Sequence, residues 1–196
     1  DRTLNKLFRL NFGNTITNIP TLTDLGTFGL LSNPDEIFMY KESDQWYGVI
    51  TNDATPYNLT RLSFSNGINA TPVADNLGNF GGLFDRPRGV SIQNDDGQVI
   101  VVVSNVNTNR LILLNFGSTI TTDIGSVTTL STSVIPGANS LFDISLIERN
   151  GLWYGFSASL NNNKIFKIDF SSNLFSDPAN VESFTPSGSV GPSTID

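Results

Sequence analysis

The sequence predicts an all-β fold, a β-propeller of four-stranded antiparallel blades. The first observation behind this prediction is a short sequence motif, called a phrase below, that leads up to a phenylalanine. It occurs four times, at Phe12, Phe64, Phe116 and Phe170. The intervals are 64−12 = 52, 116−64 = 52 and 170−116 = 54 residues. A fixed period of about fifty residues is typical of an array of one supersecondary unit, which buries its apolar faces against its neighbours.

The second observation is the content of one repeat. Residues 87–93 alternate polar and apolar side chains, 94–97 end in Asp-Gly, and 98–104 contain five consecutive apolar residues. Residues 110–116 alternate again, and 127–130 form a shorter, more polar run. Asp-Gly favours a hairpin, and a strand that is apolar on both faces lies between two neighbours. Four strands joined by short turns match a propeller blade, and the chain shows no long helical period.

The blade boundaries follow from the strand that lines the central channel, because this innermost strand begins each blade of a propeller. Complete blades are expected at 34–82, 87–133 and 139–187, with the outer strands of an incomplete blade at 4–29 and the start of an inner strand at 190–196. We therefore expect a partial propeller of about three full blades plus incomplete end blades, as one region of a longer chain. Open blade edges expose unpaired backbone groups. The isolated chain is expected to aggregate or to bind other chains along these edges.

Burial is expected to follow the strand pattern. We expect Val101 and Val103 to be largely buried, together with Tyr154 and Phe156 of the next repeat. The four phrase-ending phenylalanines are expected to have similar surroundings.

Composition excludes several classes of protein. The chain has 196 residues, of which 38% are hydrophobic and 15% charged, so it is neither a disordered tail nor a membrane-inserted protein. Eighteen acidic and eleven basic residues give a net charge of −7, which argues against nucleic-acid binding. The absence of Cys and His removes disulfides, thiolate nucleophiles, His-based triads and the usual zinc sites.

Several phrases of the chain are similar to a known type of repeat. The segments 5–14, 18–26, 69–72 and 76–83, together with the Trp-Tyr-Gly strands, carry the resemblance. They resemble repeats of very large Bacteroidetes surface proteins, which are similar to gliding-motility adhesins and other cargo of the type IX secretion system. The resemblance covers nearly the whole chain and weakens at 121–140 and after residue 173. It implies an extracellular or cell-surface location, a protein or glycan surface ligand, and partners among secretion-system or outer-membrane proteins.

Four polar residues are the candidate ligand-binding site. Glu36, Arg88, Asp143 and Thr194 are aligned at one position near the mouth of the channel, where a propeller would build such a site. The alternative is a salt-bridged rim, with Arg88 between two carboxylates. Propeller lactonases hold calcium in the channel with carboxylate and Asn oxygens, and hard cations prefer such ligands. The Asn-rich turns near 52, 105 and 161 offer calcium a second place, and the stronger explanation for Asn there is that it suits turns for conformational reasons.

Two aromatic pairs have two interpretations. Trp46 and Tyr47 recur as Trp153 and Tyr154 at the same position of a blade. These side chains could stack on sugar rings, but their fixed place within a buried strand favours packing between blades.

The predicted function is that of a non-catalytic recognition or spacer module of a large adhesin, without a cofactor. No turnover is expected on lactones, glycosides or phosphoesters, because the chain has no His and no Cys and the channel position varies from Glu to Arg to Asp to Thr. One alternative is a propeller enzyme with a channel metal, lactonase-like or lyase-like. Another is a secretion cargo bound to a transport machine. Calcium that survives dialysis against a chelator would favour the enzyme.

Overall fold

A computed structural model describes residues 1–186 of the chain. In this part all regular structure is β, apart from two short 3₁₀ turns, η1 (Ile124–Ser126) and η2 (Leu160–Asn162). The strands form one two-stranded and three four-stranded antiparallel sheets, so the prediction of propeller blades is confirmed. No helix among the described residues is long and apolar enough to cross a membrane.

The strands follow one another in each sheet in chain order. The two-stranded sheet contains β1 (Leu7–Asn11) and β2 (Thr21–Gly26). The first complete blade contains β3 (Pro34–Glu42), β4 (Gln45–Asn52), β5 (Asn58–Phe64) and β6 (Val73–Gly78). The second contains β7 (Pro87–Asp95), β8 (Gln98–Asn105), β9 (Arg110–Asn115) and β10 (Thr128–Val134). The third contains β11 (Ser145–Arg149), β12 (Leu152–Ser159), β13 (Lys164–Ser171) and β14 (Asn180–Phe184).

The inner strands of the first two blades begin in the same way. Pro34 pairs with Asn52 and Pro87 pairs with Asn105, and in both blades the ladder is interrupted over the next two residues. Proline has no N–H to donate, so it is tolerated at the first residue of a strand. The interruption leaves the backbone of residues 35–36 and 88–89 free to bond outside its own blade.

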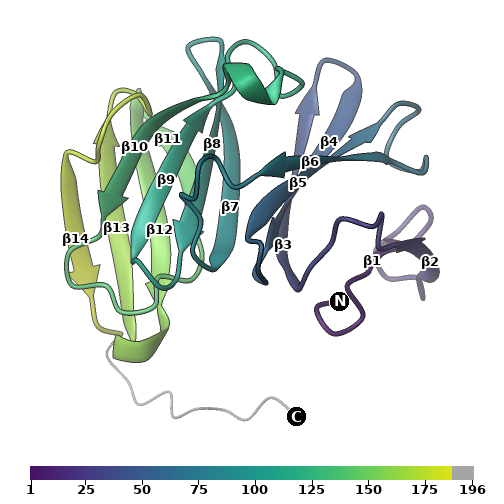
Figure 1. Cartoon of the computed structure of the whole chain (residues 1–196), viewed down its shortest axis with the longest axis horizontal. Coiled ribbons are helices and arrows are strands. Elements are labelled where there is room, and N and C mark those ends of the chain that lie inside the picture. Colours follow the sequence, from purple (N-terminus) through teal and green to yellow (C-terminus); the bar gives the residue numbers. More distant parts are fainter. Residues whose placement is uncertain (187–196) are drawn as a thin grey trace.

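Three apolar cores hold the blades face to face. One core lies between β1–β2 and the first blade, a second between the first and second blades, and a third between the second and third blades. Figure 1 shows the sheets side by side in chain order, with β7 next to β3. The strand β8 is apolar on both faces because Val101 and Val103 lie in one core while Ile100 and Val102 lie in the next.

The burial predictions are correct for the middle blade and wrong at one end. Val101 and Val103 are fully buried, but Tyr154 is half-buried and Phe156 is 43% exposed. Both lie on the face of the third blade that points away from the second, and no described residue covers that face. Of the phrase-ending phenylalanines, those at 64, 116 and 170 are buried, whereas Phe12, directly after β1, is half-buried.

Candidate functional site at the channel mouth

The inner strands of neighbouring blades approach closely at Gly89. Its N–H donates to the carbonyl of Phe142 at 3.0 Å. A Cβ on Gly89 would lie 2.6 Å from the backbone nitrogen of Ile144, which no real side chain tolerates. The next residue, Val90, donates its N–H to Glu36 Oε2 at 2.7 Å. The three inner strands are therefore joined side by side at the positions of the predicted site.

Three of the four predicted site residues are brought together. Glu36, Arg88 and Asp143 line one hollow of about 270 Å³, and the other lining residues are Asp35, Gly89 and Phe142. Thr194 and the expected inner strand at 190–196 lie outside the described residues. Ligand binding in this hollow stays a prediction.

The alignment of Arg88 is corrected by the strand register. Counting from Pro34 and Pro87, the residue equivalent to Glu36 is Gly89, and Arg88 is equivalent to Asp35. Glu36 and Asp143 thus share a position that in the second blade has no side chain. Arg88 still lines the hollow, from the neighbouring position.

Arg88 belongs to a network of ion pairs beside the hollow. Its Nη1 lies 3.2 Å from Asp35 Oδ1 and its Nη2 lies 2.8 Å from Asp53 Oδ2. Arg2 also bridges both carboxylates, at 2.8 Å to Asp35 and 2.7 Å to Asp53, and Arg86 binds Asp53 at 3.1 Å. Arg88 does lie between two carboxylates, but these are Asp35 and Asp53, not Glu36 and Asp143 as in the rim predicted as the alternative.

Glu36 and Asp143 are the carboxylates left outside this network. Burial raises the pKa of Glu36 to about 7, and the nearby charges of Asp143 and Asp35 act in the same direction, against the N–H bond from Val90. Burial also raises the pKa of Asp35, against the lowering effect of Arg88 and Arg2. The hollow therefore holds a carboxyl group whose pKa lies near neutral pH, beside the exposed side chain of Asp143.

One wall of the hollow is shaped by an aromatic contact. The guanidinium carbon of Arg88 lies 4.5 Å from the centre of the Phe142 ring, and the Thr51 hydroxyl donates to the Arg88 carbonyl at 2.6 Å. The sequence reasoning missed Asp35 and Phe142. The sequence does contain a pattern that could have identified them. Asp35 and Phe142 lie at the same position as Arg88, one residue after the start of each inner-strand phrase.

Among residues 1–186, no group of three or more carboxylates is arranged to hold a metal ion. The expectations about calcium stay predictions. In the Asn-rich turns, Asn52 and Asn105 instead accept hydrogen bonds from the backbone of Ser32 and Asp85.

Three of the four paired aromatic side chains pack between neighbouring sheets, as favoured above, whereas Tyr154 lies on the open face of the third blade. Tyr47 and Trp153 are 6% and 7% exposed, and Trp153 Nε1 donates to Asp95 Oδ1 at 3.0 Å. Trp46 is half-buried against the core beside β1–β2.

No family model and no curated protein sequence matches this chain. Among the solved structures that share its fold are two described as glycoside hydrolases. The catalytic domain of the Coprinopsis cinerea GH62 alpha-L-arabinofuranosidase has a TM-score of 0.56 and 15% identity, over 76% of this chain and 50% of that one. GH43B of the Bacteroides ovatus xyloglucan locus has a TM-score of 0.50 and 14% identity, over 74% of this chain and 28% of that one. The chain thus spans half or less of the length of these structures.

These neighbours correct the expectation that the chain is not an enzyme. Both are glycoside hydrolases by description, and this finding favours the alternative of a propeller enzyme over a non-catalytic adhesin module. The expectation relied on the absence of His and Cys. That reason was insufficient, because glycoside hydrolysis needs only a pair of Asp or Glu side chains. At 14–15% identity the likeness itself establishes the fold.

Proposed function

We propose that the channel-mouth hollow hydrolyses glycosidic bonds, with Glu36 as the general acid and Asp143 as its carboxylate partner. The observation that carries the proposal is the pKa of Glu36, raised to about 7 next to Asp143. A general acid is most effective when its pKa lies near the working pH. Glycoside hydrolysis uses a pair of carboxyl groups, of which the general acid has a raised pKa.

The chemistry follows from these two roles. Glu36 gives its proton to the leaving oxygen as the bond from that oxygen to the anomeric carbon breaks. Asp143 either takes a proton from the water that attacks this carbon or bonds to the carbon itself, and water then releases the sugar. The configuration of the released sugar distinguishes the two, because the first route inverts the anomeric carbon and the second retains it.

The surroundings of the hollow suit an uncharged sugar. Asp35 is neutralised by Arg2 and Arg88, and the Phe142 ring gives an apolar surface beside polar groups. The description of the GH62 neighbour suggests α-L-arabinofuranosides as the first substrates to examine. A cell-surface or secreted location, with a surface glycan as the ligand, is part of this proposal.

Aryl α-L-arabinofuranosides with leaving groups of differing acidity test the proposal. Glu36→Gln should lower turnover by about 10²–10⁴-fold on a poor leaving group, and much less on nitrophenol, which needs little protonation. Asp143→Asn should lower turnover on both substrates. The matched control is Glu182→Gln, an exposed residue of β14. Equal losses for Glu36→Gln on both leaving groups, or no turnover by the unmodified protein on any aryl glycoside, would refute it.

A further inference from the structure

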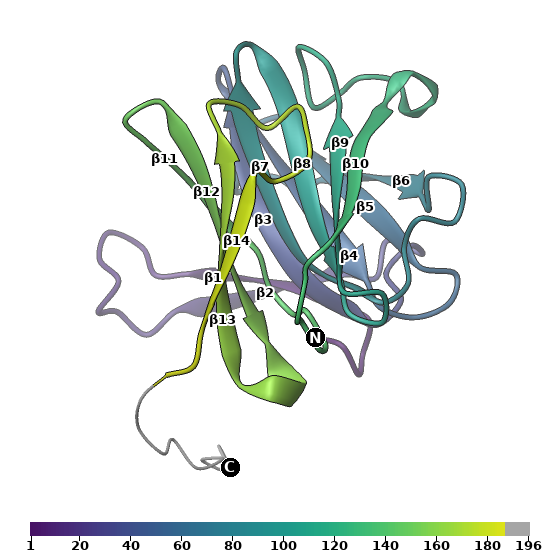
Figure 2. The ribbon, with the colours of Figure 1, turned by 90° about the vertical axis from the view of Figure 1, so that its left-hand side faces the viewer.

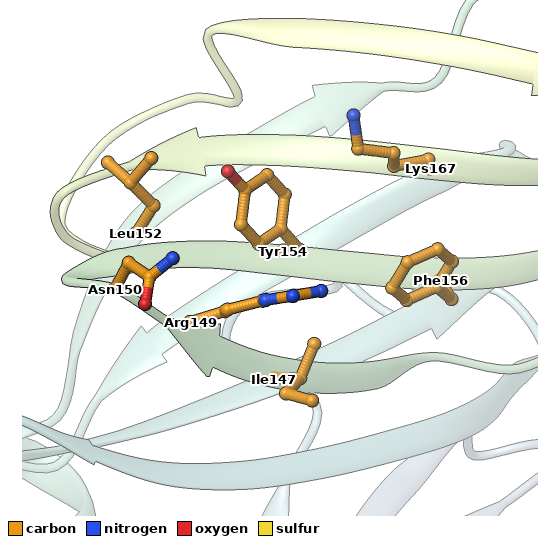
Figure 3. Close-up of a pocket in the computed structure, with 7 residues that line it drawn as sticks. All are labelled: Ile147, Arg149, Asn150, Leu152, Tyr154, Phe156 and Lys167. Carbon is orange, nitrogen blue, oxygen red and sulfur yellow. The ribbon is translucent and has the colours of Figure 1, made fainter.

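The outward face of the third blade is apolar and uncovered within residues 1–186. Phe156 and Ile165 are 43% and 45% exposed, and Ile147 is 53% exposed. Figure 2 looks onto β11–β14 from this side, and Figure 3 shows Tyr154 between Leu152 and Phe156 on β12. Apart from Ile165, these side chains line a hollow of about 480 Å³. Contiguous exposed apolar surface of this kind marks an interaction site.

The same positions are buried in the other two blades. Aligned through the pairing of the second and third strands, Tyr154, Phe156 and Ile165 correspond to Tyr47, Val49 and Leu59 and to Ile100, Val102 and Leu111. All six of the latter are at most 6% exposed, because the following blade packs on them. The exposed face therefore has the form that receives another sheet of the same repeat.

The N-terminal sheet of β1 and β2 has an open face of the complementary kind. Leu10 on β1 is 53% exposed, and Leu22, its partner on β2, is 64% exposed. In the repeated phrase, Leu10 corresponds to Leu62, Leu114 and Ile168, which are fully buried against the preceding sheet. No sheet precedes β1 within the described residues. This face therefore has the form that packs onto a face like that of the third blade.

We propose that the open face of the third blade binds the N-terminal sheet of a second copy of this chain. Figure 1 shows the two faces at opposite ends of the row of sheets, so the contact joins two copies, head to tail. In this contact β1 and β2 of the second copy take the place of the two outer strands of a following blade. The contact thus continues the packing that already joins successive sheets. Head-to-tail contacts join copies into a ring or into an open row.

A hydrogen bond that recurs between successive sheets supports this pairing. Arg9 Nη1 donates to the carbonyl of Ile68 at 3.0 Å, and Arg61 Nη1 donates to that of Ile120 at 2.7 Å. In both cases the acceptor lies in the loop between the third and fourth strands of the following blade, 59 residues later (68−9 and 120−61). An arginine at this place in the phrase thus ties its own sheet to the next one.

Lys167 is the equivalent cation on the open face. It is the third residue of its phrase, as Arg61 is, and its ammonium group pairs only loosely with a carboxylate of its own blade, at 3.6 Å. In the second copy the equivalent acceptor is the carbonyl of Ile16. This residue follows a repeated phenylalanine by four positions, as Ile68 and Ile120 do (16−12, 68−64 and 120−116). Ile16 is 80% exposed, so its loop is open to the contact.

One contact of the repeat is missing from this pairing. Glu42 and Asp95, at the outer ends of β3 and β7, accept N–H groups from the same loop of the following blade. The residue at the corresponding hairpin end of the third blade is Arg149, which cannot accept a hydrogen bond. The N–H of Ile16 in the second copy therefore finds no acceptor there. We expect the association to be reversible and weaker than the packing between blades of one chain.

Two charge substitutions in the full chain test the contact, one on each face. Leu10→Glu places a carboxylate on the N-terminal sheet, and Ile165→Glu places one on the third blade. Both side chains are exposed, so neither change disturbs a core. Each variant alone should self-associate at least about thirtyfold more weakly than the unmodified chain, because a charge would be buried in the contact without a partner. The matched control is Val73→Glu, at a 65% exposed position of β6 in the first blade.

Sedimentation velocity over a series of concentrations measures the association. The unmodified chain and the control should form larger species as the concentration rises. An equimolar mixture of Leu10→Glu and Ile165→Glu should form a one-to-one dimer and nothing larger. The reason is that each variant keeps the face that the other has lost, so a single head-to-tail contact remains.

Other modes of association give different results. If the third-blade face bound its own counterpart, Leu10→Glu would still associate and the mixture would form no mixed dimer. If copies paired along open strand edges, neither substitution would weaken the association. A monomer at every concentration would show that no second copy binds. Each of these three results overturns the proposal, and none depends on catalytic activity.

A gain of affinity tests the alignment of the two copies. Arg149→Glu supplies the acceptor that Glu42 and Asp95 supply between blades of one chain. It should tighten self-association by about tenfold, the effect of one hydrogen bond to a charged group. The control is Arg149→Ala, which removes the cation without adding an acceptor. Equal affinities for these two variants would show that the loop of Ile16 does not reach this hairpin, and would overturn the proposed alignment.

Discussion

Gly89 determines how closely two inner strands approach, and thereby how Glu36 is held. Without a side chain, the backbone at Gly89 reaches Phe142 on one side, while its neighbour Val90 reaches Glu36 on the other. A larger residue would separate Asp143 from Glu36 by pushing the strands apart. Burial is the main cause of the raised pKa of Glu36, and the nearness of Asp143, which adds to it, depends on the close approach at Gly89.

Glu36 should make stability depend on pH in a defined window. Its pKa is raised from about 4.5 to about 7 on folding, chiefly by burial. Between these values the folded protein binds more protons than the unfolded chain, so the free energy of unfolding falls as pH rises through the window. Glu36→Gln should remove this fall and be more stable than the unmodified protein above pH 7. Urea unfolding below, within and above the window measures it, with Glu182→Gln as the control. If the free energy of unfolding depended on pH in the same way for Glu36→Gln and Glu182→Gln, the prediction would be wrong.

Two hairpin ends carry the contacts that join one blade to the next. Glu42 and Asp95 lie eight residues after the proline that begins their strands (42−34 and 95−87). Glu42 accepts from the N–H of Ile120 at 3.2 Å, and Asp95 accepts from that of Leu174 at 2.7 Å. Each carboxylate thus satisfies a backbone group of the following blade, and both residues form part of the repeat.

Asp95→Ala should destabilise the interface between the second and third blades. Asp95 is 8% exposed and also accepts from Trp153 Nε1, so its loss leaves two buried N–H groups without an acceptor. At about 1–3 kcal/mol for each of the two unsatisfied groups, we expect a loss of about 2–6 kcal/mol. Chemical unfolding followed by Trp fluorescence measures it. Asp44→Ala, at a fully exposed position, should change stability by under ~0.5 kcal/mol. A similar small change at Asp95 would mean that these bonds contribute little.

The strands were predictable from the sequence because their signals are local. The apolar run at 99–103 and the repeated phenylalanines place each strand in its blade, as found. The exposure of Phe156 was not predictable from its own strand, since burial depends on what lies across the face. The position of Arg88 was misjudged because Gly89, which has no side chain, occupies the aligned place. Asp53 pairs with three arginines that lie far from it in the sequence, and no short sequence pattern predicts these pairs.

At the scale of the whole molecule, Asp53 joins three successive units of the chain. Its side chain is fully buried and binds Arg2 near the N-terminus as well as Arg86 and Arg88 at the start of the second blade. Arg2 and Arg88 are both shared with Asp35 on β3. The face-to-face cores set the distance between blades, and this network ties the same blades together beside the channel mouth.

Asp53→Asn should therefore weaken the molecule as a whole. A neutral amide leaves three guanidinium groups around a buried position without their shared anion, and removing one partner of a buried ion pair typically costs about 3–5 kcal/mol. The control is Asp75→Asn, because Asp75 is 49% exposed and pairs with Arg61 at 3.2 Å on the surface. A surface pair of this kind contributes about 0–1 kcal/mol. Urea unfolding at neutral pH compares the two. The expected difference arises because Asp53 is screened from water whereas Asp75 is not, and equal losses would show that the buried network does not hold the blades together.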